Sequence, residues 1–363
     1  MKIIQTTDIH FKQEEPYFRA GVALFNFILD HLRSQVEPFI YLDSGDLFHV
    51  SKETGRVNRE VVKFFLQMAT IPNCYFIYVM QGNHDVKEET GSALDLLRGL
   101  DVKIKVVDTP CFPSIPVENT SDIKTLTKIY LLPHMKPFSI PNYSGVKSYG
   151  DDNFHREYWK SQNIDWDEVK EGIKFVSVHG GDETTGKFFM NVDLSIIPGI
   201  RSNGHVHKQV SKNQLTSASV TRRDEIDKKC FIRHINTDNW EVSEIEIPLF
   251  LNYAQIPYGE DIDGYFESSI HLKPKESLIV DIFGHDDAKL VISEYEKKWA
   301  DCQSPKLYIG EVSPVERRGE AVIVEERDDL DISSINIKEL FQEFCEEKKL
   351  AKSIVEDLMS RID

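Results

Sequence analysis

Residues 74–85 read CYFIYVMQGNHD, an apolar run that passes through one glycine into three polar residues. The aromatic and β-branched side chains of 74–80 are typical of a buried strand. Asn83 and Asp85 alone would be ordinary turn residues, because their side chains bond the local backbone. His84 adds a metal ligand, an acid or neither. The segment leaves these alternatives open, so its meaning depends on the rest of the chain.

Two earlier segments have the same form. KIIQTTD (2–8) and PFIYLDSGD (38–46) are apolar runs that end in polar residues, and both are predicted as strands. Apolar residues at helical spacing predict helices over Tyr17–Arg33 and Asn58–Met68. An alternation of strands and helices indicates an α/β layered fold whose sheet is covered on both faces. We expect layers of β-sheets flanked by helices.

Further strands follow in the middle of the chain. IYLLPHM (129–135), IKFVSVHGG (173–181) and the stretch around GHVH (204–207) are predicted as strands and their exits. Residues 228–248 alternate as a hairpin or meander. We expect this hairpin to close a first domain, residues 1–248, near Pro248.

The remainder of the chain has a different organisation. A strand, helix, strand pattern over Ser277–Val312 predicts a small α/β unit within residues 249–312. Residues 313–331 are mostly charged and indicate an acidic linker. Residues 332–363 predict two short amphipathic helices. The apolar positions of these helices are Ile337, Leu340, Phe341, Phe344, Ile354, Leu358 and Ile362.

Composition limits the class of protein. With 363 residues, 40% of them hydrophobic and 28% charged, the chain matches a soluble globular protein of more than one unit. Asp8 interrupts the N-terminal apolar run, so we expect no targeting segment. The five cysteines are scattered and suit reduced thiols in the cytoplasm. A net charge of −17 argues against a general basic surface that binds nucleic acid. Bound divalent cations could nevertheless make the electrostatic potential at an active site positive.

Potential metal ligands stand at the predicted strand ends. The carboxyl ends of strands in open α/β sheets gather at one edge, so we expect these side chains to meet there. Asp8 and His10 are two residues apart and would point the same way on an extended chain; His205 and His207 repeat this spacing. The full set is Asp8, His10, Asp46, Asn83, His179, His205 and His207, with His84 in addition.

This donor set predicts two metal ions. One divalent ion has no need of two carboxylates, one amide oxygen and four histidines, whereas two ions sharing a bridging carboxylate do. Imidazole and oxygen donors without thiolate favour manganese, iron or zinc. Two such ions can activate water and stabilise both oxygens of a displacement at phosphorus, which indicates phosphoester hydrolysis. Each of these segments alone could be a turn or a hydrogen-bonded polar residue with no function. Five such segments in order, each at a predicted strand end, favour a metal site.

The segments DIH, GD, GNHD, VHGG and GHVH together resemble those of the calcineurin-like metallophosphoesterases. Within that group the chain is most similar to the SbcD-type nuclease subunits, including phage-encoded relatives, which act with the SbcC ATPase in double-strand-break processing. GDLFH (45–49) and LLPHM (131–135) extend the likeness. The small unit and the tail stand where that family has a DNA-capping domain and an ATPase-binding helix pair.

The resemblance implies roles for individual residues. It implies one metal held by Asp8, His10, Asp46 and His207, and a second held by Asp46, Asn83, His179 and His205, with Asp46 as the bridge. His84 would contact the scissile phosphate and protonate the leaving oxygen. His49 would help to position the phosphodiester; the alternative is a strand-exit residue with its ring in solvent.

The chain departs from the resemblance after GHVH. Relatives commonly have Gly-Ser beyond the next strand, whereas this chain has LTSASVTRRDE (215–225). Thr216 and Ser217 are therefore candidate phosphate contacts. Arg222 and Arg223 are candidate contacts to a nucleic-acid backbone, and a solvated surface pair is the alternative for at least one of them.

The implied function is a two-metal DNA exonuclease, with endonuclease activity as an addition. Manganese is the expected ion and magnesium the alternative. DNA, an SbcC-like ATPase bound through the C-terminal helices, and a second copy of the chain are the expected partners; a membrane is not. Two alternatives stay open. One is a protein phosphatase, cyclic-nucleotide phosphodiesterase or nucleotidase on the same core; the other is a scaffold without catalysis.

Overall fold

The computed structural model describes ten segments of the chain. These are residues 1–52, 54–86, 91–113, 129–134, 152–180, 196–205, 230–248, 250–259, 278–300 and 307–314. The chain divides into two units, Met1–Glu316 and Arg317–Asp363. The second unit, with the two predicted C-terminal helices and most of the predicted linker, lies outside the described residues. The domain boundaries stay predictions.

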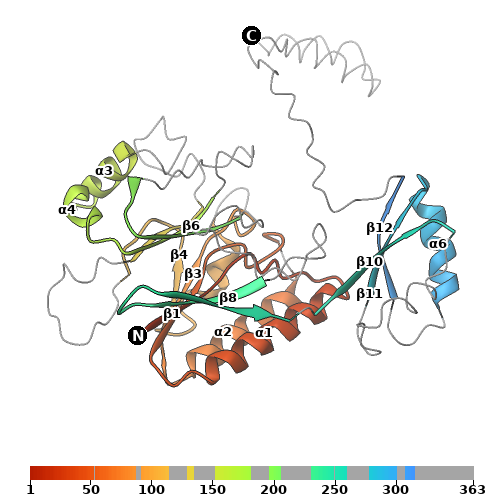
Figure 1. The fold of residues 1–363 in the computed structure, drawn as a ribbon, viewed down its shortest axis with the longest axis horizontal. Coiled ribbons are helices and arrows are strands. Elements are labelled where there is room, and N and C mark those ends of the chain that lie inside the picture. The colour runs from red at the N-terminus through yellow and green to blue at the C-terminus, as the bar shows by residue number, and fades with distance from the viewer. Residues whose placement is uncertain are drawn as a thin grey trace, which may run out of the picture. The chain divides into compact units, whose positions relative to one another are not determined.

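A six-stranded sheet forms the centre of the first unit (Figure 1). Its strands, in spatial order, are β4 (Ile104–Val107), β3 (Cys74–Met80), β2 (Phe39–Asp43), β1 (Lys2–Thr6), β8 (Cys230–Asn236) and β9 (Val242–Ile247). The first four are parallel, and the predicted hairpin β8–β9 continues the sheet antiparallel to β1. The parallel strands all end at the same edge.

Two helices cover one face of this sheet (Figure 1). Helix α1 spans Tyr17–Arg33, as predicted. Helix α2 spans Gly55–Ala69 and begins before the predicted Asn58, because the apolar stripe starts with the buried Val57. Phe25 of α1 stacks on Phe64 of α2 with ring centroids 4.0 Å apart. The two helices therefore form one apolar layer with the sheet.

A second sheet covers the other face. It consists of three parallel strands, β5 (Ile129–Leu132), β6 (Phe175–His179) and β7 (Ile200–Gly204). Ile3 and Leu42 of the first sheet and Phe175 of the second belong to the apolar core between them. The predicted layered α/β fold is confirmed, with a sheet in place of helices on this face.

Short helices that the sequence did not predict complete the layers. Helices α3 (Asp152–Ser161) and α4 (Trp166–Lys170) place Trp159 and Trp166 against the outer face of the second sheet. The 3₁₀ helix η1 (Ala93–Leu97) starts at a capping box and precedes β4. The order of layers is thus helix, sheet, sheet, helix.

A separate three-stranded sheet follows in the chain. Strands β10 (Asn252–Pro257), β11 (Leu278–Phe283) and β12 (Leu307–Ser313) are parallel, and α6 (Ala288–Trp299) packs against them. The predicted strand, helix, strand pattern is present here, and β10 is an addition to it. Across the described segments, no helix has both the length and the apolar character needed to cross a membrane.

Candidate metal centre

Six of the seven predicted ligands lie within the described residues, and they converge at the common edge where β1, β2, β3, β6 and β7 end. Three groups of side chains each have ligand atoms within 4.8 Å of one another. These groups are Asp8 with His10 and Asp46, Asp46 with His179 and His205, and His10 with His49 and His84. Asp46 belongs to two of them. It is 1% exposed, so its carboxylate is enclosed by the other donors.

The backbone at Asp8 and His10 differs from the extended chain expected from the sequence. Strand β1 ends at Thr6, and the φ angles of Asp8 and His10 are +53° and +49°. The cause is the neighbouring loop after β2. Asp8 N–H donates to the Gly45 carbonyl at 2.8 Å, and His10 N–H donates to the Asp46 carbonyl at 2.9 Å. The two side chains meet because of this paired loop.

Positive φ angles are concentrated at the candidate ligands. Among the described residues, six non-glycine residues have positive φ, and four of them are Asp8, His10, Asp46 and His205. This backbone region is costly for residues with a Cβ, and such residues cluster at functional sites. The fold therefore holds these side chains in place at the expense of local backbone strain.

His179 has the environment of a metal ligand. Its Nδ1 lies 2.8 Å from the Ser44 carbonyl, which can only accept, so Nδ1 carries a proton. Nε2 lies 3.1 Å from Asp46 Oδ2 and 3.1 Å from Asn83 Oδ1. In a neutral ring, the Nε2 lone pair would therefore face two oxygens that are also electron-pair donors. A divalent cation between the three atoms removes this repulsion, and octahedral ligands at bonding distance are about 3 Å apart.

The charges of Asp46 and His179 are strongly linked. Burial alone would raise the pKa of Asp46, but His179, with contributions from His10 and His84, holds it well below its usual range. Burial alone would lower the pKa of His179, but the charge and hydrogen bond of Asp46 raise it to about 10. A positive charge is thus favoured between the two side chains, as expected at a cation site.

The other side of Asp46 faces His10. Asp46 Oδ2 lies 3.8 Å from His10 Nε2, which is 4.0 Å from Asp8 Oδ1. Asp8 is oriented by the Thr7 hydroxyl, which donates to Oδ2 at 2.6 Å, and by the His205 N–H, which donates to Oδ1 at 2.9 Å. Asp46 therefore stands between two half-sites, where a bridging carboxylate would lie.

His84 and His49 line the accessible side of the site. The Nδ1 of His84 donates to the His49 carbonyl at 2.6 Å, so its Nε2 is the nitrogen left to meet a substrate. The rings of His49 and His84 are stacked at 5.7 Å. His49 Nδ1 is buried, so the ring is not in open solvent. Burial, with the charges of Lys12 and His84, lowers the pKa of His49 to about 4, which leaves the ring neutral at pH 7.

Asp85 connects two of the ligand-bearing loops. Its carboxylate accepts the N–H groups of Asp46 at 3.0 Å, Phe48 at 3.1 Å and Gly82 at 2.8 Å. Burial and the charge of Asp46 raise the pKa of Asp85 to about 7. The side chain thus fixes the loop after β2 to the turn after β3, which matches the orienting role that a turn aspartate can have.

Glycine is required where the backbone approaches a ligand. A Cβ on Gly82 would collide with the carboxylate and the backbone nitrogen of Asp46. A Cβ on Gly45, whose φ is +104°, would collide with the ring of His179. Close approach of the main chain to the site is the physical reason for both glycines.

His134 is a neighbour of the site for which the sequence alone predicted no role. It follows β5, and its N–H donates to the Gln81 carbonyl at 2.7 Å. Burial lowers its pKa to about 4, with further effects from the charges of His179, Asp46, His205 and His84. Its position after a strand in LLPHM was the signal that could have identified it.

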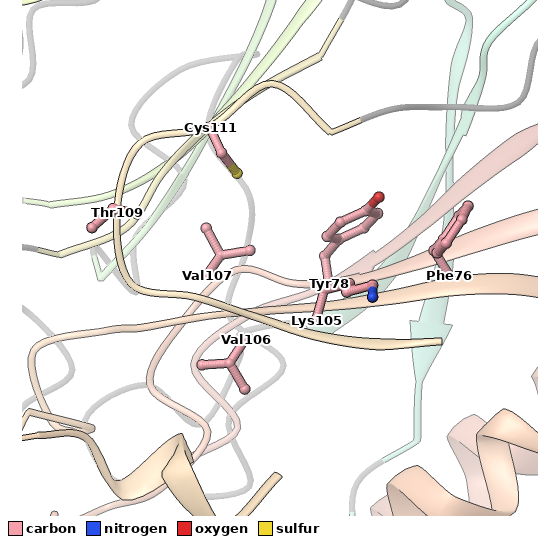
Figure 2. A pocket seen from close by; sticks show the side chains of 7 residues that line it. All are labelled: Phe76, Tyr78, Lys105, Val106, Val107, Thr109 and Cys111. Carbon is pink, nitrogen blue, oxygen red and sulfur yellow. The ribbon is translucent and has the colours of Figure 1, made fainter. Parts of the chain in front are cut away.

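The described segments also contain a pocket of about 350 Å³ on β3 and β4 (Figure 2). Its lining consists of Phe76, Tyr78, Lys105, Val106, Val107, Thr109 and Cys111. Burial raises the pKa of the Cys111 thiol to about 12, so it is no thiolate nucleophile at neutral pH. None of the predicted ligands lines this pocket.

Five candidate site residues lie outside the described residues. These are His207, Thr216, Ser217, Arg222 and Arg223. Their predicted contacts with metal, phosphate or nucleic acid stay predictions.

The fold and the cluster of carboxylate, amide and imidazole donors define a metal-dependent phosphoester hydrolase. A family model described as calcineurin-like phosphoesterase matches residues 1–209. The match covers more than half of the chain, so the chain belongs to the calcineurin-like phosphoesterase family. A search of curated proteins returns no match.

Proposed function

We propose that this chain is a two-metal DNA phosphodiesterase that processes DNA ends together with an SbcC-like ATPase of the SMC family. The observation that carries the proposal is the pairing of His49 with His84 beside the candidate metal centre. His49 is the last residue of GDLFH, the segment that extends the general Gly-Asp motif toward the nuclease type. Its carbonyl accepts the Nδ1 proton of His84 at 2.6 Å, and its ring stacks on the His84 ring at 5.7 Å. The side chain that ends the extension therefore packs directly against His84.

In this proposal the chain's residues have separate tasks. Asp8, His10, Asp46 and His207 hold one divalent ion, and Asp46, Asn83, His179 and His205 hold the other, with manganese as the preferred ion and magnesium as the alternative. When bound, the ions supply Lewis-acid polarisation of the phosphoryl oxygens. His84 presents Nε2 to the scissile phosphate and donates a proton to the departing oxygen.

We assign the binding of DNA and of the ATPase to the remaining parts of the chain. The unit around β10, β11, β12 and α6 caps the DNA. In the first domain, Thr216 and Ser217 contact phosphate, and Arg222 and Arg223 contact the DNA backbone. The C-terminal helices bind the ATPase, and two copies of the chain act in one complex. Because the net charge is −17, we expect the isolated chain to bind DNA weakly and with steep salt dependence.

A substrate comparison tests the proposal. The full chain is incubated with Mn²⁺ and end-labelled linear duplex DNA, circular single-stranded DNA, a cyclic nucleotide or a phosphopeptide, with and without the candidate ATPase. We expect metal-dependent cleavage of linear DNA that increases with the ATPase. Strong turnover of the cyclic nucleotide or the phosphopeptide, with none on DNA, would assign a different substrate class to the same site.

A deletion tests the docking of the ATPase. Removal of residues 331–363 should abolish co-elution with the ATPase and leave Mn²⁺ binding unchanged. Unchanged co-elution would show that the C-terminal helices are not the docking segment.

A further inference from the structure

Four polar side chains form a fully enclosed cluster at the inner end of the candidate metal centre. Gln5 Nε2 lies 2.6 Å from the Ser44 hydroxyl, 3.1 Å from the Ser177 hydroxyl and 2.8 Å from the Ser202 hydroxyl. The hydroxyls of Ser44 and Ser177 are 2.9 Å apart. All four residues are 0% exposed. We call them the glutamine–serine cluster.

The cluster joins the two sheets. Gln5 lies on β1 and Ser44 follows β2 in the six-stranded sheet, whereas Ser177 and Ser202 are register partners on β6 and β7. Earlier in these strands the contact between the sheets is apolar, through Ile3, Leu42, Phe175 and their neighbours. The polar cluster therefore replaces the apolar core only near the carboxyl ends of the strands.

Each member of the cluster precedes a candidate ligand on its own segment. Ser44 is followed by Asp46 and Ser177 by His179, in each case two residues later. Gln5 is followed by Asp8 and Ser202 by His205, in each case three residues later. Ser44 is also linked to the site directly, because its carbonyl accepts the Nδ1 proton of His179 at 2.8 Å. A shift of one cluster member would thus move the ligand that follows it.

The hydrogen bonds of the cluster are poorly explained by stability alone. The Gln5 amide has two protons for three hydroxyl oxygens. Its Oε1 is buried without a hydrogen-bond partner among the described residues. An apolar side chain at this position would avoid the desolvation of these groups. Directional hydrogen bonds do, however, fix one relative position of two packed sheets, which apolar contacts specify less sharply.

We propose that the glutamine–serine cluster is a positioning device for the metal centre. It fixes the position of one sheet relative to the other, so that Asp8 and Asp46 from one sheet meet His179 and His205 from the other. Gln5, Ser44, Ser177 and Ser202 are positioning residues in this role, because they act through the ligands and touch no substrate. The proposal rests on the proposed two-metal function.

Mn²⁺ titration of variants tests the cluster. Gln5→Met removes the amide at similar volume, and Ser177→Ala removes one hydroxyl. Val178→Ala is the matched control, because Val178 neighbours Ser177 on β6 but is buried in the core on the opposite face of the second sheet. Calorimetry gives the Mn²⁺ affinity, electron paramagnetic resonance reports the coupling of the two ions, and thermal unfolding with a chelator gives the stability of the metal-free chain.

We expect Gln5→Met and Ser177→Ala to lower Mn²⁺ affinity by about tenfold, the size of effect known for residues that orient metal ligands. Their two-manganese signal should weaken, with unfolding midpoints close to that of the wild type. Val178→Ala should lower the unfolding midpoint and leave Mn²⁺ affinity unchanged. Wild-type affinity and signal in both cluster variants would overturn the positioning role.

The titration also separates the two proposals. If the wild-type chain binds no Mn²⁺ at all, the metal centre itself is wrong and the cluster proposal falls with it. If the wild type binds Mn²⁺ and all three variants lose affinity in proportion to stability, only the cluster proposal is overturned. Should Gln5→Met fail to fold, Ser177→Ala decides between the same outcomes.

Discussion

His179 Nε2 lies 3.1 Å from Asp46 Oδ2, and both side chains are buried. His179 comes from the second sheet and Asp46 from the loop after β2 of the first. This contact therefore joins the two halves of the candidate metal centre. The contact favours a positive charge between the two side chains, carried either by a proton on His179 Nε2 or by a divalent cation that replaces this proton.

Asp46→Asn tests the bridging position. An amide keeps the shape of the carboxylate but removes its charge and one acceptor oxygen, while His10 and His179 stay in place. We expect Mn²⁺ affinity to fall by at least about 100-fold, since loss of a ligand should exceed the effect of an outer residue. Calorimetric titration measures it. Asp108→Asn is the control, because Asp108 pairs with Arg98 on the surface; equal affinity in the two variants would contradict the role of Asp46.

His84→Gln separates catalysis from metal binding. His84 donates Nδ1–H to the His49 carbonyl, and the proposal assigns Nε2 to proton donation rather than to a metal. We expect turnover to fall by about 10²–10⁴, the usual contribution of a general acid, with two ions still bound. Elemental analysis and a hydrolysis assay measure both properties. Loss of the metals in this variant would mean that His84 is a ligand.

Gly82→Ala tests the close approach of the backbone to Asp46. The new methyl group would displace the Asp46 carboxylate or its loop, so we expect weaker Mn²⁺ binding and a loss of about 1–3 kcal/mol in the free energy of unfolding. Gly55→Ala is the matched control, because Gly55 opens α2 and a methyl group there would meet no atom within 4 Å. Unfolding curves and Mn²⁺ titration of both variants measure the effect. Similar behaviour of the two would refute the steric argument.

A pair of histidines away from the site predicts a pH dependence of stability. His31 Nε2 of α1 and His234 Nε2 of β8 are 2.7 Å apart. Burial, with the charges of His31 and Lys2, lowers the pKa of His234 to about 4. Between pH 6.5 and pH 4 the unfolded chain therefore binds the proton and the folded chain does not. Stability from this group is present above pH 6.5 and decreases as the pH falls toward 4.

His234→Gln tests this dependence, because an amide keeps a hydrogen-bonding group without titrating. We expect the wild type to lose about 1–3 kcal/mol more than the variant between pH 7 and pH 4. Chemical unfolding at a series of pH values, with a chelator present, measures the difference. Parallel pH profiles of the two proteins would contradict the shifted pKa.

Strong periodic signals made part of the fold predictable from the sequence. The stripe through Phe18, Phe25 and Leu32 places α1 correctly, since a helix that covers a sheet needs a continuous apolar face. Helix α3 was missed because it buries only Phe154, His155 and Trp159, too few positions for a recognisable period. The layered arrangement of β-sheets flanked by helices was predicted, but not which strands belong to which sheet, because apolar strands look alike under a helix or a second sheet.

The convergence of six predicted ligands, Asp8, His10, Asp46, Asn83, His179 and His205, could be expected from the sequence, but the backbone geometry that brings them together could not. Ligand types at strand exits indicated which side chains would meet, because parallel strands share one carboxyl edge. The left-handed backbone at Asp8 and His10 depends on hydrogen bonds to the loop of residues 45–47, which no local pattern encodes. The glutamine–serine cluster could not be predicted from the sequence either. Each serine alone forms no recognisable motif, and only the packing of the two sheets brings them together.

The number of manganese ions bound by the wild-type chain is the decisive measurement for a two-metal centre. Metal-free protein is titrated with Mn²⁺, freed of excess ion and analysed for manganese per chain. We expect two ions per chain, with a magnetically coupled signal if Asp46 is shared between them. One ion per chain, two uncoupled ions or none would contradict a two-metal centre at this site.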